Sequence, residues 1–205
     1  MEDFTTLKEY ASYTYEEKKS VFIGECAPVS SESEALSFIN NIKKKYPDAR
    51  HHVYAYILRE NSIMRYSDDH EPQGTAGMPV LDSMRKRGVT DAVAVVTRYF
   101  GGTLLGTGGL VRAYTEAASG AVSLSGVITY TTFKKCSLSV SYSDYQKIQS
   151  VLSEHGFRTD ATDFRESVTI EGRVLLFEAD ALCTALSEQT GGRATLVFGE
   201  EVYDY

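Results

Sequence analysis

Apolar residues recur along this chain with two different periods, and the clearest change from one to the other lies between residues 89 and 118. The unbroken apolar run 92–96 predicts a buried strand. Five glycines follow between residues 101 and 109, and behind them apolar residues recur at helical spacing from 110 to 121. We therefore expect a strand, a glycine loop and a helix in succession, with Thr103 or Thr107 capping the start of the helix.

The pattern before this stretch predicts further strands and helices. A weakly alternating segment at 20–26 and a segment apolar on both faces at 53–58 predict strands, the latter inside the sheet with 63–66 as a short partner. Ser31 and Glu34 fit a capping box in front of a helical stripe that ends before Pro47. A second helix is expected over 78–87, and the tyrosine-rich residues 1–17 are expected to form an edge strand or a lid.

From Phe133 the order of the expected elements changes. Strand 136–142, helix 143–155, strands 158–165 and 167–177, helix 179–189 and strand 194–198 give the order βαββαβ, which is the ferredoxin-like split plan. We place the boundary within 129–134. The sequence thus predicts a two-domain protein of the α+β or α/β class, with domains 1–130 and 131–205.

Composition limits the function classes. The chain has 205 residues, 42% of them hydrophobic and 24% charged, as in ordinary globular proteins. No apolar run is long enough to span a bilayer, and the beginning of the sequence has no secretory signal. The three cysteines are scattered, which argues against a disulfide framework and points to the cytoplasm. The net charge of −7 opposes nonspecific nucleic-acid binding.

The glycine loop is the first candidate binding feature. Glycines permit close approach to the backbone, and free N–H groups at a helix start favour an anion, with Arg98 and Arg112 flanking. The alternative is a tight connector whose glycines only allow helix and sheet to pack closely. The loop lacks the Gly-Lys-Ser/Thr of a Walker A motif and the register of a dinucleotide fingerprint.

The long loop 67–77 is the second candidate. Residues 68–71 read Asp-Asp-His-Glu, which suits either a divalent metal or a solvated acidic loop. The glycines and amides behind them offer a second set of exposed N–H groups. If both glycine loops lie at the same end of the sheet, they form one polar cleft rimmed by Arg50, His51, His52 and Arg98.

These candidates form one predicted anion- or partner-binding face. Its residues are Arg50, His51, His52, Asp68, Asp69, Glu71, Gln73, Gly74, Thr75, Gly77, Arg98, Gly101, Gly102, Gly106, Thr107, Gly108, Gly109 and Arg112. No catalytic residue, metal site or cofactor is predicted. Two alternatives stay open. The first is an enzyme that binds a small phosphorylated or anionic substrate at the glycine loop and uses His51, His52 or Glu71 for acid–base work. The second is a nucleic-acid binder that uses Lys43–Lys45, Arg85–Arg87 and Arg98.

Residues 68–81 and 96–118 carry a specific similarity, which 18–23 and 50–56 extend: the chain resembles the IMPACT/YigZ family over its whole length. The resemblance implies a first domain of the type found in a small-subunit ribosomal protein and in GHMP kinases, and a second domain like the last domain of elongation factor G. The resemblance also implies that eukaryotic relatives restrain an amino-acid-starvation kinase by binding its activator through an N-terminal extension, which we expect this chain to lack.

For bacterial members the resemblance implies a translation-linked or nucleic-acid-linked regulator. We accordingly expect a cytoplasmic, non-enzymatic regulator of translation or stress response. Its expected partners are the ribosome, RNA or a protein of these pathways, with a small anion as a further ligand and no membrane.

Overall fold

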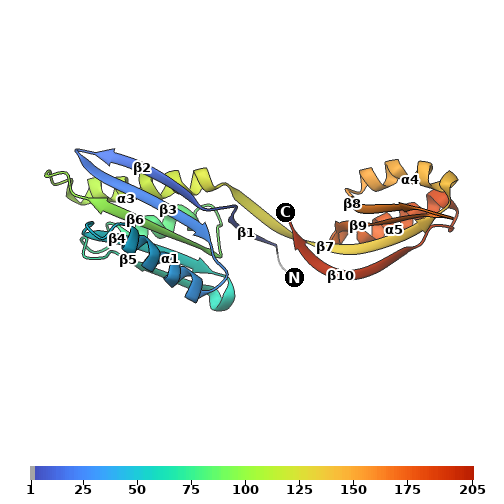
Figure 1. Ribbon diagram of the computed structural model, residues 1–205, viewed down its shortest axis with the longest axis horizontal. Helices are drawn as coiled ribbons and strands as arrows, with labels where there is room; N and C mark the ends of the chain where they lie inside the picture. The colour runs from blue at the N-terminus through green and yellow to red at the C-terminus, as the bar shows by residue number, and fades with distance from the viewer. Residues whose placement is uncertain (1–2) are drawn as a thin grey trace. The chain divides into compact units, whose positions relative to one another are not determined.

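The computed structural model describes residues 3–205, which divide into two compact units. The first unit is Phe4–Thr129, and the second comprises Tyr130–Tyr205 together with Asp3. Figure 1 labels their helices and strands. Of the expected edge strand or lid over residues 1–17, residues 1 and 2 lie outside the described part. Each unit is described by itself below.

The first unit is built on a five-stranded sheet with the order β2-β3-β6-β4-β5. Every adjacent pair in this sheet is antiparallel, so the unit is α+β, and the α/β alternative is not observed. The strands of the unit are β1 (Phe4–Leu7), β2 (Ala11–Glu17), β3 (Ser20–Pro28), β4 (His51–Leu58), β5 (Ile63–Ser67) and β6 (Ala92–Tyr99). The prediction that the segment at 53–58 lies inside the sheet is confirmed. Of the edge strand or lid expected over residues 1–17, residues 11–17 form the edge strand β2, and Phe4–Leu7 form the separate strand β1.

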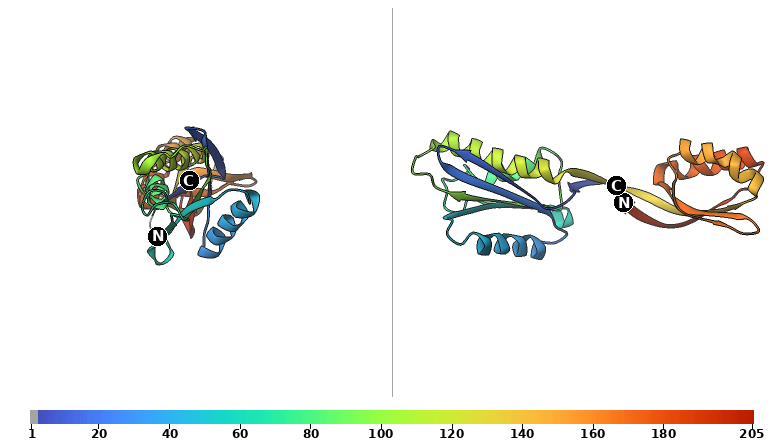
Figure 2. Two further views of the ribbon diagram at one scale, coloured as in Figure 1. Left: turned by 90° about the vertical axis from the view of Figure 1, so that its left-hand side faces the viewer. Right: turned by 45° about the horizontal axis from the view of Figure 1, so that its top comes forward.

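Helices cover both faces of this sheet, as Figure 2 shows. The larger core lies under α2 (Gly77–Arg85) and α3 (Gly106–Ser125), and a second core lies under α1 (Glu32–Lys45). Because β6 is apolar on both faces and sits in the middle, its side chains contribute to both cores. A short 3₁₀ turn, η1 (Glu60–Ser62), joins β4 to β5.

The helix starts differ from one another. At α1, the Ser31 hydroxyl accepts from the Glu34 N–H at 3.3 Å, as a capping box requires. The Glu34 carboxylate accepts at 2.7 Å from the N–H of Ser30, one residue before the N-cap residue Ser31. At α3 the N-cap residue is Leu105, and no side chain caps the helix. The expectation that Thr103 or Thr107 would cap α3 is therefore wrong.

The second unit has the element order βαββαβ predicted from the sequence. Its elements are β7 (Val127–Val140), α4 (Tyr142–Glu154), β8 (Arg158–Phe164), β9 (Val168–Leu175), the short turn η2 (Leu176–Glu178), α5 (Ala179–Thr190) and β10 (Leu196–Asp204). The strands pair antiparallel in the order β8-β9-β7-β10, and β1 also pairs with β7. α4 and α5 share one core with this sheet.

Two strands are longer than their apolar patterns predict. β7 begins at Val127 rather than 136, so the boundary between the units falls inside a strand, and β10 continues to Asp204 rather than ending at 198. The two strands pair from Leu196 with Leu138 to Asp204 with Thr131, and the pairs beyond the predicted strand ends include Glu201 with Lys134 and Asp204 with Thr131. Backbone hydrogen bonds between β7 and β10 thus extend both strands through residues whose side chains show no strand periodicity. Among the described residues, no helix combines the length and hydropathy needed to cross a bilayer.

Candidate functional site

A cavity of about 430 Å³ opens in the first unit where several predicted residues converge. It is bounded by the start of β4, the loop before α2, the end of β6 and the start of α3. The lining residues are Arg50, His51, His70, Glu71, Pro72, Arg98, Phe100, Leu104, Leu105, Gly106, Thr107 and Leu110. The site thus combines cationic and titratable side chains, a helix start and an apolar wall.

The helix start at this cavity has free backbone donors. The N–H groups of Gly106, Thr107 and Gly108 have no acceptor among residues 3–205, and all three residues are exposed. The first N–H groups of any helix lack partners inside it, and α3 is 20 residues long, so its dipole favours an anion here. Gly106 has φ +71°, which favours glycine at this position.

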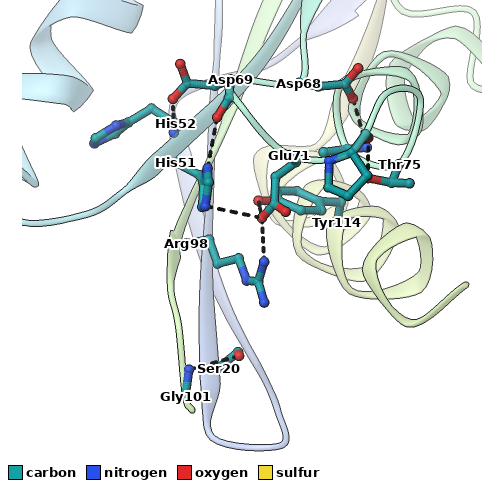
Figure 3. Close-up of polar contacts among 12 residues, drawn as sticks. Ser20, His51, His52, Asp68, Asp69, Glu71, Thr75, Arg98, Gly101 and Tyr114 are labelled. Atoms are coloured by element: carbon teal, nitrogen blue, oxygen red, sulfur yellow. Dashed lines mark hydrogen bonds and ion pairs between the residues drawn. The ribbon is translucent and has the colours of Figure 1, made fainter. Parts of the chain in front are cut away.

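The floor of the cavity is a buried polar network on Glu71, drawn in Figure 3. Arg98 Nη1 donates to Glu71 Oε1 at 2.5 Å, and the Tyr114 hydroxyl donates to the same oxygen at 2.8 Å. Arg98 is 6% exposed and Glu71 9% exposed. Burial and the adjacent Glu71 carboxylate raise the pKa of Tyr114, so its hydroxyl stays a donor. Glu71 is therefore not part of a solvated acidic loop.

Arg98 retains unused donor capacity. Its Nε is buried and has no hydrogen-bond acceptor within the described part of the chain. A buried N–H without an acceptor is unfavourable, since hydrogen bonds to charged groups are worth about 1.5–3 kcal/mol. The guanidinium carbon also lies 5.6 Å from the centroid of the Phe100 ring. Arg98 thus links the apolar wall to the polar floor.

His51 is oriented by a backbone carbonyl. Its Nδ1 lies 2.9 Å from the Asp69 carbonyl oxygen, which can only accept, so Nδ1 carries a hydrogen. In the neutral ring Nε2 then has a free lone pair, and it lies 3.9 Å from Glu71 Oε1. The side chain can accept a proton here or, once protonated, add a positive charge to the cavity.

The loop that carries Glu71 has an unusual backbone. Asp69 and His70 both have positive φ, +42° and +70°. Residues other than glycine adopt this backbone conformation at a cost of about 1–3 kcal/mol each. The Asp69 carboxylate holds the loop to β4 by accepting from the His52 N–H at 2.7 Å. The fold thus maintains a strained loop next to the cavity.

Asp68 caps α2 and removes the second predicted set of free amides. Its carboxylate accepts from the N–H groups of Gly74, Ala76 and Gly77 at 2.9, 3.0 and 2.7 Å. The Thr75 N–H and hydroxyl both donate to the Pro72 carbonyl, at 3.0 and 2.6 Å. The expectation that these amides are exposed is wrong, because the fold's own oxygen atoms already accept from them.

Other predicted residues lie away from the cavity lining. His52 is buried, and its Nε2 contacts the Tyr46 carbonyl oxygen at 3.0 Å. Gly101 is a packing position: its N–H donates to Ser20 Oγ at 3.0 Å, and a Cβ there would lie 2.0 Å from a Lys19 backbone atom. The lining also excludes Gln73, Gly102, Gly108, Gly109 and Arg112, while Gly74 lines a separate cavity of about 340 Å³ between α2 and α3.

The basic patch considered for nucleic acid does not form. Lys43–Lys45 belong to α1, on the opposite face of the sheet from α2, which carries Arg85. Lys45 pairs with Glu25 at 2.7 Å, Arg85 with Asp82 at 2.8 Å, and Arg98 is buried against Glu71. Their charges are dispersed and partly neutralised.

The sequence reasoning missed the apolar wall and Tyr114. Phe100 and Leu104 are 48% and 84% exposed, and the helical spacing over 110–121 predicts only that Tyr114 is buried. One signal was available for Tyr114: it is the single tyrosine among alanines on that face, and a buried tyrosine hydroxyl needs a partner. Among residues 3–205, no group of three or more His, Cys, Asp or Glu side chains is placed to hold a metal ion.

Comparison with known proteins identifies the family. Residues 18–122 match the Impact N-terminal domain, and residues 138–193 match a domain of unknown function, DUF1949. The chain belongs to the IMPACT/YigZ family. It is 37% identical over 204 residues to the IMPACT family member YvyE of Bacillus subtilis, covering 99% of this chain and 94% of that protein.

Two further relatives span most of the chain. The IMPACT family member YigZ of Escherichia coli is 31% identical, covering 90% of this chain and 92% of its own. A crystal structure described as that of a hypothetical protein is similar with a TM-score of 0.61 and 30% identity, covering 98% of both chains. These similarities extend through both units.

Proposed function

We propose that this chain is a non-enzymatic, cytoplasmic regulator linked to translation or stress response, and that it binds its partner through an anionic group at the start of α3. The observation that carries the proposal is the set of free N–H groups at Gly106, Thr107 and Gly108 beside a cavity that Arg50 and Arg98 line. Anion binding at such a helix start follows from its unpaired donors and its dipole.

Family and fold support this direction. The eukaryotic relatives named in the resemblance act in translation control, and the first unit is proposed to share the architecture of a ribosomal protein domain. The second unit is proposed to be ferredoxin-like, and its strand order β8-β9-β7-β10 supports this. Its strands β7 and β9 contain two aromatic residues, Tyr130 and Phe133. Phe133 is buried, and the Tyr130 ring packs edge-on against Tyr205 at 5.3 Å between ring centroids, so base stacking on these two strands does not support RNA readout.

Binding is favoured over catalysis because Glu71 is already engaged. Its Oε1 accepts from both Arg98 and Tyr114 in the buried floor, an arrangement that stabilises the fold rather than leaving a free acid or base. One observation keeps an enzyme as the second candidate: His51 Nε2 carries a lone pair at the cavity. Screening phosphorylated metabolites for turnover, with His51→Gln as the comparison, separates the two candidates.

Sedimentation with ribosomes tests the regulator. Arg50 is exposed and lines the cavity, whereas Lys44 is exposed on α1 at the opposite face of the sheet. We expect the wild type and Lys44→Glu to sediment with ribosomes at low salt, Arg50→Glu to remain in the supernatant, and all binding to fall as salt rises. Absence of the wild type from ribosomal and RNA fractions at low salt would contradict the proposal.

A further inference from the structure

We propose that the cavity at the start of α3 binds a small organic phosphate whose carbon part is a planar ring. This inference rests on the anion-binding role proposed above and specifies the class of ligand. It is drawn from two unlike halves of one cavity, a cationic half with unused donors and an apolar half with exposed side chains.

The polar half has more donor capacity than the fold uses. Gly106 and Thr107 line the cavity with free N–H groups, and Gly108 carries a third one next to the lining. The side chain of Arg98, which also lines the cavity, is only 6% exposed, and its Nε has no acceptor among the described residues. A phosphate offers several strong acceptor oxygens in one group, which suits convergent donors of this kind. Because the Glu71 carboxylate compensates Arg98, the exposed Arg50 supplies the net positive charge at the opening.

The cavity is too large for a phosphate ion alone. Its volume of about 430 Å³ falls in the range of roughly 300–1,000 Å³ that is typical of sites for organic ligands. The remaining wall consists of Phe100, Leu104, Leu105 and Leu110. Leu104 is 84% exposed, so a substantial apolar surface faces water unless a ligand covers it.

The exposed aromatic ring indicates a planar partner. Phe100 is 48% exposed, and the Arg98 guanidinium lies 5.6 Å from its centroid, so one cation is already placed near the ring. Flat rings stack on exposed aromatic side chains, and such stacking is worth about 1–3 kcal/mol where bases are involved. A ring bonded to a phosphate would place the phosphate near the free donors while its carbon atoms cover the apolar wall.

Calorimetric titration of the full chain with three probes tests this assignment. The probes are phenyl phosphate, glycerol 3-phosphate and inorganic phosphate. We expect phenyl phosphate to bind at least about tenfold more tightly than glycerol 3-phosphate of equal charge, because burying a phenyl ring is strongly favourable. Phe100→Ala should remove this preference and leave the affinity for inorganic phosphate unchanged, since Phe100 lies outside the helix start.

A matched pair at Gly108 tests the anion half. A Cβ at Gly108 meets no atom within 4 Å, and the position is exposed in the first turn of α3. Gly108→Glu places a carboxylate beside the free donors, where acidic residues favour a helix, so the variant folds but repels phosphate. We expect Gly108→Glu to bind all three probes about tenfold or more weakly than Gly108→Gln, which has the same size without the charge.

The outcomes separate this inference from the function on which it rests. If the three probes bind equally and Phe100→Ala changes nothing, the planar ring is refuted and the anion site stands. If none binds, or Gly108→Glu has no effect, the anion site is refuted as well. If only single-stranded oligonucleotides bind, and Phe100→Ala weakens them, the cavity belongs to a nucleic-acid surface and the small ligand is refuted. Sedimentation with ribosomes reports on the regulator independently of all three.

Discussion

At the scale of single residues, the Glu71 carboxylate determines whether the cavity keeps its shape. It compensates the buried Arg98 guanidinium and accepts from Tyr114. Glu71→Gln keeps the side-chain shape but leaves the guanidinium uncompensated, so we expect unfolding free energy to fall by about 3–5 kcal/mol. Tyr114→Phe removes one neutral donor and should cost about 1 kcal/mol. Urea unfolding of both variants measures this.

The double variant provides the control. Because Tyr114 and Arg98 contact the same oxygen, the two losses should not add, and an interaction energy of about 0.5 kcal/mol or more is expected. If Glu71→Gln and Tyr114→Phe each lowered the unfolding free energy by the same small amount, and the double variant by their sum, Glu71 would be solvated rather than buried in the network.

Single residues also show where sequence reasoning stops. The prediction of one cleft rimmed by His51 and Arg98 depends on both glycine loops lying at the same end of the sheet, and the structure brings these two residues and Glu71 to one cavity. The capping of α2 by Asp68 was not predictable, because its acceptor role spans six to nine residues of a loop without periodicity. The same loop carries two non-glycine residues at positive φ, which no pattern of side chains announces.

At the scale of elements, α3 packs on β3 at a point where only glycine fits. A Cβ on Gly24 would lie 2.2 Å from the Ala117 carbonyl oxygen, so helix and strand are in backbone contact there. We expect Gly24→Ala to lower stability by about 1–3 kcal/mol through overpacking. Gly108→Ala, in open space on the same helix, should raise stability by up to about 1 kcal/mol. Thermal unfolding measures both changes in stability. A loss of stability in Gly108→Ala as large as that in Gly24→Ala would contradict this packing.

The elements themselves were largely predictable because most carry a clear period or cap. The strand, glycine loop and helix from 92 to 125 follow from periodicity alone. There are two exceptions: the last part of β10 and the first part of β7 mix polar and apolar positions without a clear period, and the start of α3 has no capping side chain. A helix start left open is the feature that a capping rule does not predict, and it is the feature on which the proposed site depends.

At the scale of the whole molecule, the two units have separate cores, one set within Phe4–Thr129 and one within Tyr130–Tyr205. The second unit contains an ion pair between a buried carboxylate and an exposed guanidinium, in which Arg193 Nε and Nη2 donate to the Asp144 carboxylate at 3.0 and 2.8 Å. Hydrogen bonding from Arg193 lowers the pKa of Asp144 to about 2, from 3.8. A carboxylate with a lowered folded-state pKa stabilises the fold above its unfolded-state pKa, and this contribution is lost as pH falls.

We therefore expect two calorimetric transitions, only one of which depends on Asp144. In the wild type, the transition of the second unit should move to lower temperature as pH falls from about 4 to about 2, because protons bind the unfolded carboxylate first. In Asp144→Asn, the transition of the second unit should occur at a lower temperature at neutral pH and should lose this part of its pH dependence. The transition of the first unit should occur at the same temperature as in the wild type. Equal shifts of both transitions would show that the two cores do not unfold separately, and an unchanged pH dependence would show that Arg193 does not hold Asp144 in solution.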